Sequence, residues 1–92
     1  MTSTSEILMG IIEQSHETAD RQRGTREGVV AHHRNLYAVS LELRLRQRGG
    51  NAEELEAEVE RMQKEPDYCG EYSYFLDAFD RQKRERGAAT AD

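Results

Sequence analysis

The sequence predicts an all-α protein of three to four helices, arranged as a bundle or as paired helical hairpins. Three observations support this: apolar residues recur at helical spacing, glycine and proline interrupt the chain, and helix-forming residues dominate between the interruptions. The 92 residues correspond to one small domain, and only 36% of them are hydrophobic, which leaves a thin core. We therefore expect self-association, as a homodimer or a larger homo-oligomer, to complete the fold.

The first predicted helix begins near Ser3 or Ser5, whose hydroxyls can cap it, and Glu6 is placed to complete a capping box with Ser3. One face of this helix is apolar, with Ile7, Leu8, Ile11 and Ile12, continued by Ser15 and Ala19. Gly24 marks the end of the helix or a kink, and Thr25 can cap the next helix.

Residues 37–46 are open to two interpretations. Their apolar residues alternate with polar or small ones, which is typical of a strand, yet the wider segment also has helical spacing. The helical face contains Val29, Val30, His33, Leu36, Tyr37, Ser40, Leu41 and Arg44. Leu, Glu, Arg and Ala favour a helix, and Val39 is the only β-branched residue of the segment after Val30. We predict a helix that contacts neighbours on more than one side.

Gly49-Gly50 is the clearest break in the chain, and Asn51 can cap a third helix after it. The apolar stripe of that helix is Ala52, Leu55, Val59 and Met62. Pro66 ends it, and Asp67 can cap a fourth helix. The stripe of the fourth helix is Tyr68, Tyr72, Phe75, Leu76 and Phe79. Residues 1–86 thus form one helical domain, and residues 87–92 are expected to be a disordered tail.

Charge is segregated along the chain. The net charge is −4 over residues 1–20, +5 over residues 21–50, −8 over residues 51–80 and +2 over residues 81–92. Such alternation predicts segments that lie antiparallel with opposite charges facing each other, within one chain or across a dimer. Exposed ion pairs contribute only about 0–1 kcal/mol each, so we expect them to set register more than stability.

Cys69 is the only cysteine, so no disulfide can form within the chain, and a reducing compartment fits best. The chain has no apolar run long enough to span a bilayer, and its first residues lack the basic start of a signal peptide. We expect a cytoplasmic protein that does not engage membranes. Cys69 is only a weak candidate nucleophile, because no histidine stands near it in sequence.

Glu13 and His16 form an E-x-x-H pair on the first predicted helix, a spacing by which some helical bundles hold iron. That chemistry needs a second such pair, but valines stand three residues before each of the other histidines, His32 and His33. We therefore predict no metal site and no cofactor, and we expect His16 to be a solvated residue on the helix surface.

His33 and Arg34 are the candidate ligand-binding residues. The simplest interpretation of His33 is a buried or interface histidine; the alternatives are a pH-sensitive contact or an anion-binding position beside Arg34. The seven arginines from Arg21 to Arg48 also raise nucleic-acid binding, which requires a basic patch. The net charge of −5 and the lack of a helix-turn-helix or zinc pattern argue against it.

Two features indicate a protein partner. The acidic run from Glu53 to Glu60 is either a solvated helix face or a surface that fits a basic groove. Aromatic residues supply anchors of the kind common at interfaces, and Tyr74 falls off its helix stripe, so it should be exposed. The candidate partner-binding residues are Arg34, Tyr37, Glu54, Glu58, Tyr74 and Phe79.

No catalytic triad, phosphate-binding loop or pair of catalytic carboxylates stands out, so we predict no enzyme activity and no catalytic residue. The expected function is protein–protein binding, as an adaptor or small inhibitor in the style of phage or mobile-element accessory proteins. The alternative is a small-ligand or metal binder that uses Glu13, His16, His33 and Arg34 at a helix interface. A further alternative is nucleic-acid binding through Arg21–Arg48.

Overall fold

The computed structural model describes residues 3–47 and 53–90, with side chains as far as residue 86. It contains α1 (Thr4–Arg21), α2 (Arg26–Gln47), α3 (Glu56–Lys64), a 3-10 turn η1 (Gly70–Tyr72) and α4 (Ser73–Thr90). These ranges contain no strand, so the all-α prediction is confirmed. The predicted break at Gly49-Gly50 and the caps and stripe residues at 51–52 lie outside the described residues.

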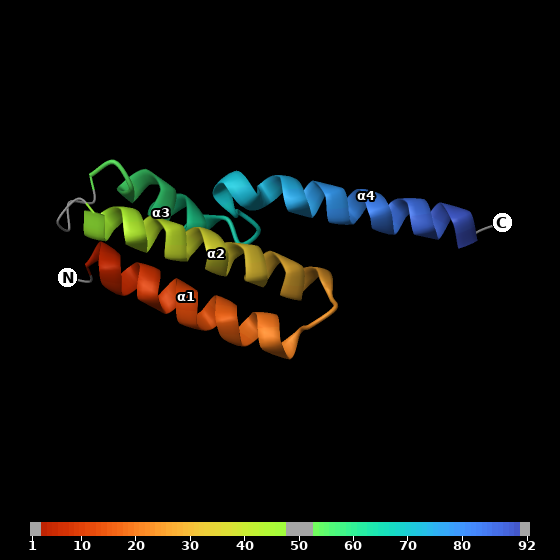
Figure 1. Ribbon diagram of the computed structural model, residues 1–92, viewed down its shortest axis with the longest axis horizontal. Helices are drawn as coiled ribbons and strands as arrows, with labels where there is room; N and C mark the ends of the chain where they lie inside the picture. Colours follow the sequence, from red (N-terminus) through yellow and green to blue (C-terminus); the bar gives the residue numbers. More distant parts are fainter. Residues whose placement is uncertain (1–2, 48–52, 91–92) are drawn as a thin grey trace.

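Helix α1 starts where the sequence predicts. Ser3 is its N-cap, and the Ser3 hydroxyl accepts a hydrogen bond of 3.1 Å from the backbone N–H of Glu6. Leu8 is fully buried, and Ser15 is buried on the same side of the helix. The remaining members of the predicted face, such as Ile7 and Ile11, are half-buried. This face packs α1 against α2 as an antiparallel hairpin (Figure 1).

The turn between α1 and α2 depends on Thr25 and Gly28. The Thr25 hydroxyl accepts a hydrogen bond of 3.1 Å from the backbone N–H of Gly28, which confirms Thr25 as the cap of α2. A Cβ added to Gly28 would lie 2.1 Å from the carbonyl oxygen of Gln22. Only glycine therefore allows the start of α2 to approach the end of α1 this closely.

Residues 37–46 are helical, which settles the choice between strand and helix. Tyr37, Ala38, Leu41 and Leu45 are buried and form the α2 side of the main core. The other core members are Leu8 of α1, Leu55, and Val59 and Met62 of α3. The predicted stripe Leu55, Val59 and Met62 is confirmed, and α3 ends at Lys64, just before Pro66.

Leu36 belongs to the predicted helical face of α2, but it is exposed, together with Val39 and Leu43. The helix carries apolar residues around much of its circumference, so spacing alone does not say which of them point inward. Packing against α1 and α3 selects the side that contains Tyr37 and Leu41.

The prediction that Asp67 caps a fourth helix is wrong, since α4 begins at Ser73 after a 3-10 turn. The chain instead bends at Gly70, whose φ of +57° lies in the left-handed region. The ring of Tyr37 packs against Gly70, and a Cβ there would lie 2.2 Å from the ring. Asp67 accepts a hydrogen bond of 3.3 Å from Arg26.

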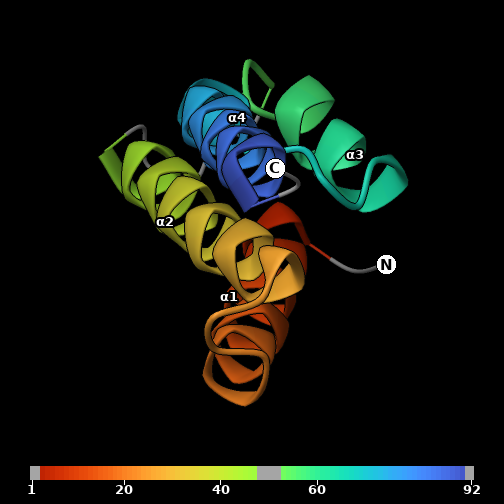
Figure 2. The ribbon, with the colours of Figure 1, turned by 90° about the vertical axis from the view of Figure 1, so that its right-hand side faces the viewer.

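Helix α4 projects from the body of the protein. Leu76 is its buried residue, and Arg26 of α2 binds Asp80 at 3.0 Å. Residues 81–86 are all exposed, and this half of α4 extends past the α1–α2 hairpin (Figure 1). The protein measures 56 × 24 × 21 Å. Viewed along its length, α4 and α1 lie on different sides of α2 (Figure 2). Residues 87–90, predicted to belong to a disordered tail, form the last turn of α4.

Candidate interaction surface

An apolar stripe runs along the solvent side of α2. Leu36 and Val39 are each 39% exposed, and Leu43 is 52% exposed. These residues are three and four positions apart, so they share one side of the helix. That side is opposite to the buried Leu41 and Leu45. The stripe is therefore a second apolar face of α2, separate from the face that builds the core.

Aromatic residues at the start of α4 extend this surface. Phe75 is 41% exposed and stacks on His33 of α2 with ring centroids 5.0 Å apart, while Tyr74 is 62% exposed and lies 4.1 Å from the Phe75 ring. The Nδ1 atom of His33 lies 2.7 Å from the Val29 carbonyl oxygen, which holds the ring in place. We call Leu36, Val39, Leu43, Tyr74 and Phe75 the apolar face.

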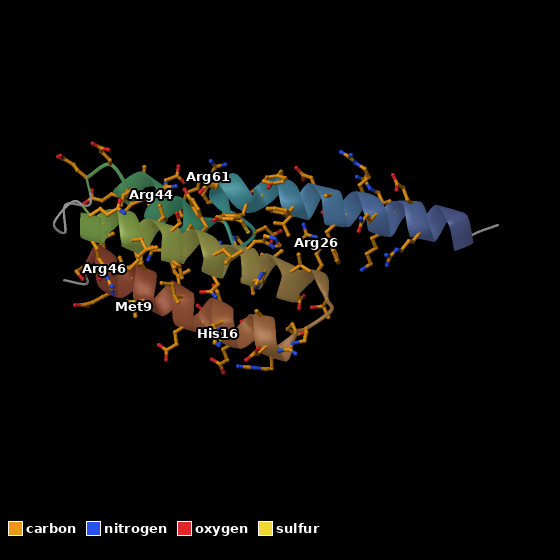
Figure 3. All side chains as sticks on the ribbon, in the orientation of Figure 1. Met9, His16, Arg26, Arg44, Arg46 and Arg61 are labelled. Carbon is orange, nitrogen blue, oxygen red and sulfur yellow. The ribbon has the colours of Figure 1, made fainter. Side chains whose placement is uncertain are left out.

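The apolar face contains five of the six large hydrophobic residues that the described chain exposes. The sixth, Met9, lies on α1 and is 50% exposed; it is marked in Figure 3. A single exposed hydrophobic residue such as Met9 needs no explanation. The apolar face is different, because three of its members share one side of α2 and its aromatic pair stacks on α2 through His33.

The apolar face carries no formal charge, although 34% of the chain is charged. Two residues between His32 and Leu43 are charged, Arg34 and Glu42, and neither faces solvent on this side. Glu42 is buried, accepts a hydrogen bond of 3.2 Å from the Ser5 hydroxyl and pairs with Arg46 at 3.1 Å. The outer surface of α2 is thus uncharged along about three turns.

Arg34 holds the end of α3 in place. Its half-buried guanidinium donates hydrogen bonds to three backbone carbonyls, those of Met62 at 2.7 Å and of Glu65 and Tyr68 at 2.9 Å. Burial lowers the pKa of Arg34 from its ordinary value. Both His33 and Arg34, predicted to bind a ligand or a partner, therefore make contacts inside the protein.

Tyr37 and Glu58, also predicted to bind a partner, meet in the interior. Tyr37 is 5% exposed, and its hydroxyl donates a hydrogen bond of 2.9 Å to Glu58. The Tyr68 hydroxyl donates a second hydrogen bond to the same carboxylate. Burial, more than the Glu58 contact, raises the pKa of Tyr37 above its ordinary value. This arrangement joins α2, α3 and the segment after α3.

The remaining predicted partner residues are dispersed. Tyr74 is exposed, as its position off the stripe predicts, and Phe79 is half-buried on α4. Glu54 is exposed before α3. The structure thus brings only Tyr74 of these three to the apolar face. Sequence reasoning missed Leu36, Val39 and Leu43 as surface residues, although their spacing was a usable signal.

Most of the arginines that were predicted to bind nucleic acid pair with acidic residues of the same chain. Among those that the structure describes, Arg26 bridges to Asp67 and Asp80, and Arg44 pairs with Glu71 at 3.2 Å. Arg21 and Arg23 pair with Glu17 and Asp20 in their own segment. Figure 3 shows Arg26 between α2 and α4. The prediction that oppositely charged segments face each other within the chain is confirmed for Arg26 and Arg44.

Two further features bear on metal binding and thiol chemistry. His16, Asp20, His32 and His33 line a hollow of about 480 Å³, but among the described side chains no three His, Cys, Asp or Glu groups converge as a metal ion requires. Cys69 is fully buried, with its sulfur 3.6 Å from the Val30 carbonyl oxygen. Burial raises the pKa of the Cys69 thiol to about 11, which keeps it protonated near neutral pH.

A groove of about 760 Å³ lies between α1, α2 and the segment after α3. Its apolar lining includes Ile7, Ile11 and Val30, and Arg26 and Asp67 stand at its edge, paired with each other. The groove mixes apolar and charged side chains, in contrast to the uncharged apolar face.

Comparison with known proteins finds no matching family model, no similar curated protein and no similar solved structure. Within the described residues, no helix is both long enough and apolar enough to cross a membrane.

Proposed function

We propose that this chain is a non-enzymatic helical module that acts by binding protein, as an adaptor or inhibitor, in the cytoplasm. The observation that supports the proposal is the apolar face, where Leu36, Val39, Leu43, Tyr74 and Phe75 lie exposed on an otherwise highly charged chain. A group of this kind costs solubility unless another surface covers it.

The composition of the apolar face suits protein recognition. Interface centres are depleted of charged residues and enriched in aromatic ones, and tyrosine is frequent among the residues that dominate binding energy. Tyr74 and Phe75 provide such rings, and the stack of Phe75 on His33 limits the freedom that binding has to remove. A partner therefore meets a largely ordered, uncharged surface.

A photo-activatable cross-linking residue placed at Val39 tests this proposal in cells that express the chain. Irradiation should yield covalent protein adducts from position 39, because that position lies at the centre of the apolar face. The matched control places the same residue at Met9, which is exposed to a similar degree outside the face and should yield none. An absence of any protein adduct from Val39 would reject the proposal.

A further inference from the structure

We propose that a second copy of this chain covers the apolar face, with the two α2 helices packed antiparallel about a two-fold axis. This inference rests on the proposed function, because it names the protein that the same face binds. It is carried by two properties of the α2 surface: the spacing of its exposed residues and the absence of charge on the apolar face.

The outer side of α2 has the spacing of a coiled-coil seam. Its exposed residues His32, Leu36, Val39 and Leu43 alternate four and three positions apart. A repeat that averages 3.5 residues keeps one stripe facing a partner helix. The three apolar members, Leu36, Val39 and Leu43, are among the most exposed large hydrophobic residues of the described chain. The stripe therefore fits another helix of the same length.

An antiparallel pair matches the stripe to itself. The centre of the stripe lies between Leu36 and Val39, so a two-fold axis at this point places Leu36 against the partner's Val39. The same operation places His32 against the partner's Leu43. Both central apolar residues of each copy are then covered by apolar residues of the other.

The lack of charge favours a self-complementary interface over a charged partner. A two-fold interface brings the same patch of both copies together, so any charge near the axis meets a like charge. Arg34 and Glu42 are bound within the chain, and Asn35 and Ser40 flank the stripe without charge. A partner recognised by opposite charge would find no matching charge on this face.

Analytical ultracentrifugation with charge-swapped chains tests the pairing. The wild-type protein should sediment at twice the chain mass of 10.6 kDa, whereas Val39→Glu and Val39→Lys should each sediment at the single-chain mass. An equimolar mixture of the two variants should restore the double mass, because the two copies of position 39 lie on either side of the two-fold axis, where opposite charges attract and like charges repel. The matched control, Met9→Glu, should remain at the double mass. Circular dichroism verifies that each variant keeps the wild-type helical content.

Cross-linking defines the orientation. A chain with His32→Cys mixed with a chain with Leu43→Cys should form mixed disulfides in preference to symmetric ones, and buried Cys69 takes no part. Preferential symmetric disulfides would overturn the antiparallel arrangement. A wild-type protein that stays at the single-chain mass at millimolar concentration would overturn the inference.

The two proposals fail in different ways. If the photo-adducts from Val39 contain only a different protein and the wild-type chain is monomeric, the proposed function stands. The second copy is then rejected as the occupant of the apolar face. A dimer that is unaffected by both Val39 substitutions also rejects this interface. No adduct of any kind together with a monomeric wild type rejects both.

Discussion

Glu58 joins three parts of the chain through one carboxylate. It accepts hydrogen bonds from Tyr37 of α2 and from Tyr68 after α3, while Glu58 itself belongs to α3. The Tyr68 bond is the largest influence that holds the pKa of Glu58 below its ordinary value; burial opposes it and the Tyr37 bond adds to it. Hydrogen bonds to the charged form of a carboxylate favour ionisation.

The lowered pKa of Glu58 predicts a pH-dependent contribution to stability. The contribution is present above the ordinary glutamate pKa of about 4.3 and is lost as the pH falls through the lower folded-state pKa. Glu58→Gln should reduce the free energy of unfolding by about 1–3 kcal/mol at neutral pH, and the difference should shrink in acid. Urea denaturation between about pH 7 and about pH 3 measures this. Exposed Glu13→Gln is the control, and a pH-independent difference would contradict the prediction.

Substitution by alanine should have opposite effects on stability at Gly70 and at Gly10. Gly70→Ala should destabilise the protein by about 2 kcal/mol or more, because φ is +57° and the Tyr37 ring occupies the space of a Cβ. Gly10→Ala should stabilise it by up to about 1 kcal/mol, because the site is helical and open. Thermal melting of both variants measures the difference, and equal effects would refute the assigned bend at Gly70.

At the scale of elements, Arg34 determines where α3 ends relative to α2. The last carbonyls of a helix lack partners within the helix, and Arg34 satisfies that of Met62 together with those of Glu65 and Tyr68 in the following segment. One side chain of α2 thereby orients the route from α3 toward α4.

Replacing Arg34 should therefore cost far more than replacing a surface arginine. Arg34→Met should lower the free energy of unfolding by about 2–4 kcal/mol, since it removes a donor from three backbone carbonyls, two of them in half-buried hydrogen bonds. Arg44→Met should cost less than about 1 kcal/mol, since the Arg44–Glu71 pair is largely exposed. Chemical denaturation compares them. Similar losses of unfolding free energy for the two variants would mean that Arg34 does not hold the end of α3 in place.

At the scale of the whole molecule, the elongated shape and the projecting α4 leave much apolar surface outside the core. If two copies share the apolar face, unfolding is linked to dissociation, so the melting temperature depends on concentration. A tenfold increase in protein should raise it by about 2–4 °C for a dimer of this size. Calorimetry over a range of concentrations measures the shift. Val39→Glu should abolish the dependence, and a constant melting temperature for the wild type would count against the dimer.

The sequence by itself determined the helical class, the starts of α1 and α2 and the end of α3. Ser3, Thr25 and Pro66 act on the backbone within a few residues, through a hydroxyl that accepts an N–H or a ring that blocks the helix. Such local interactions do not depend on the rest of the fold. The same reasoning assigned residues 37–46 to a helix from composition alone.

Only the tertiary structure decided which side of α2 faces inward and where α4 begins. Both sides of α2 carry leucine, and the neighbours that bury Leu41 leave Leu36 in solvent. Asp67 can cap a helix, but Arg26 takes its carboxylate and Gly70 bends the chain beneath Tyr37. These outcomes depend on contacts between residues far apart in sequence. The free energies of such contacts cannot be inferred from a local sequence pattern.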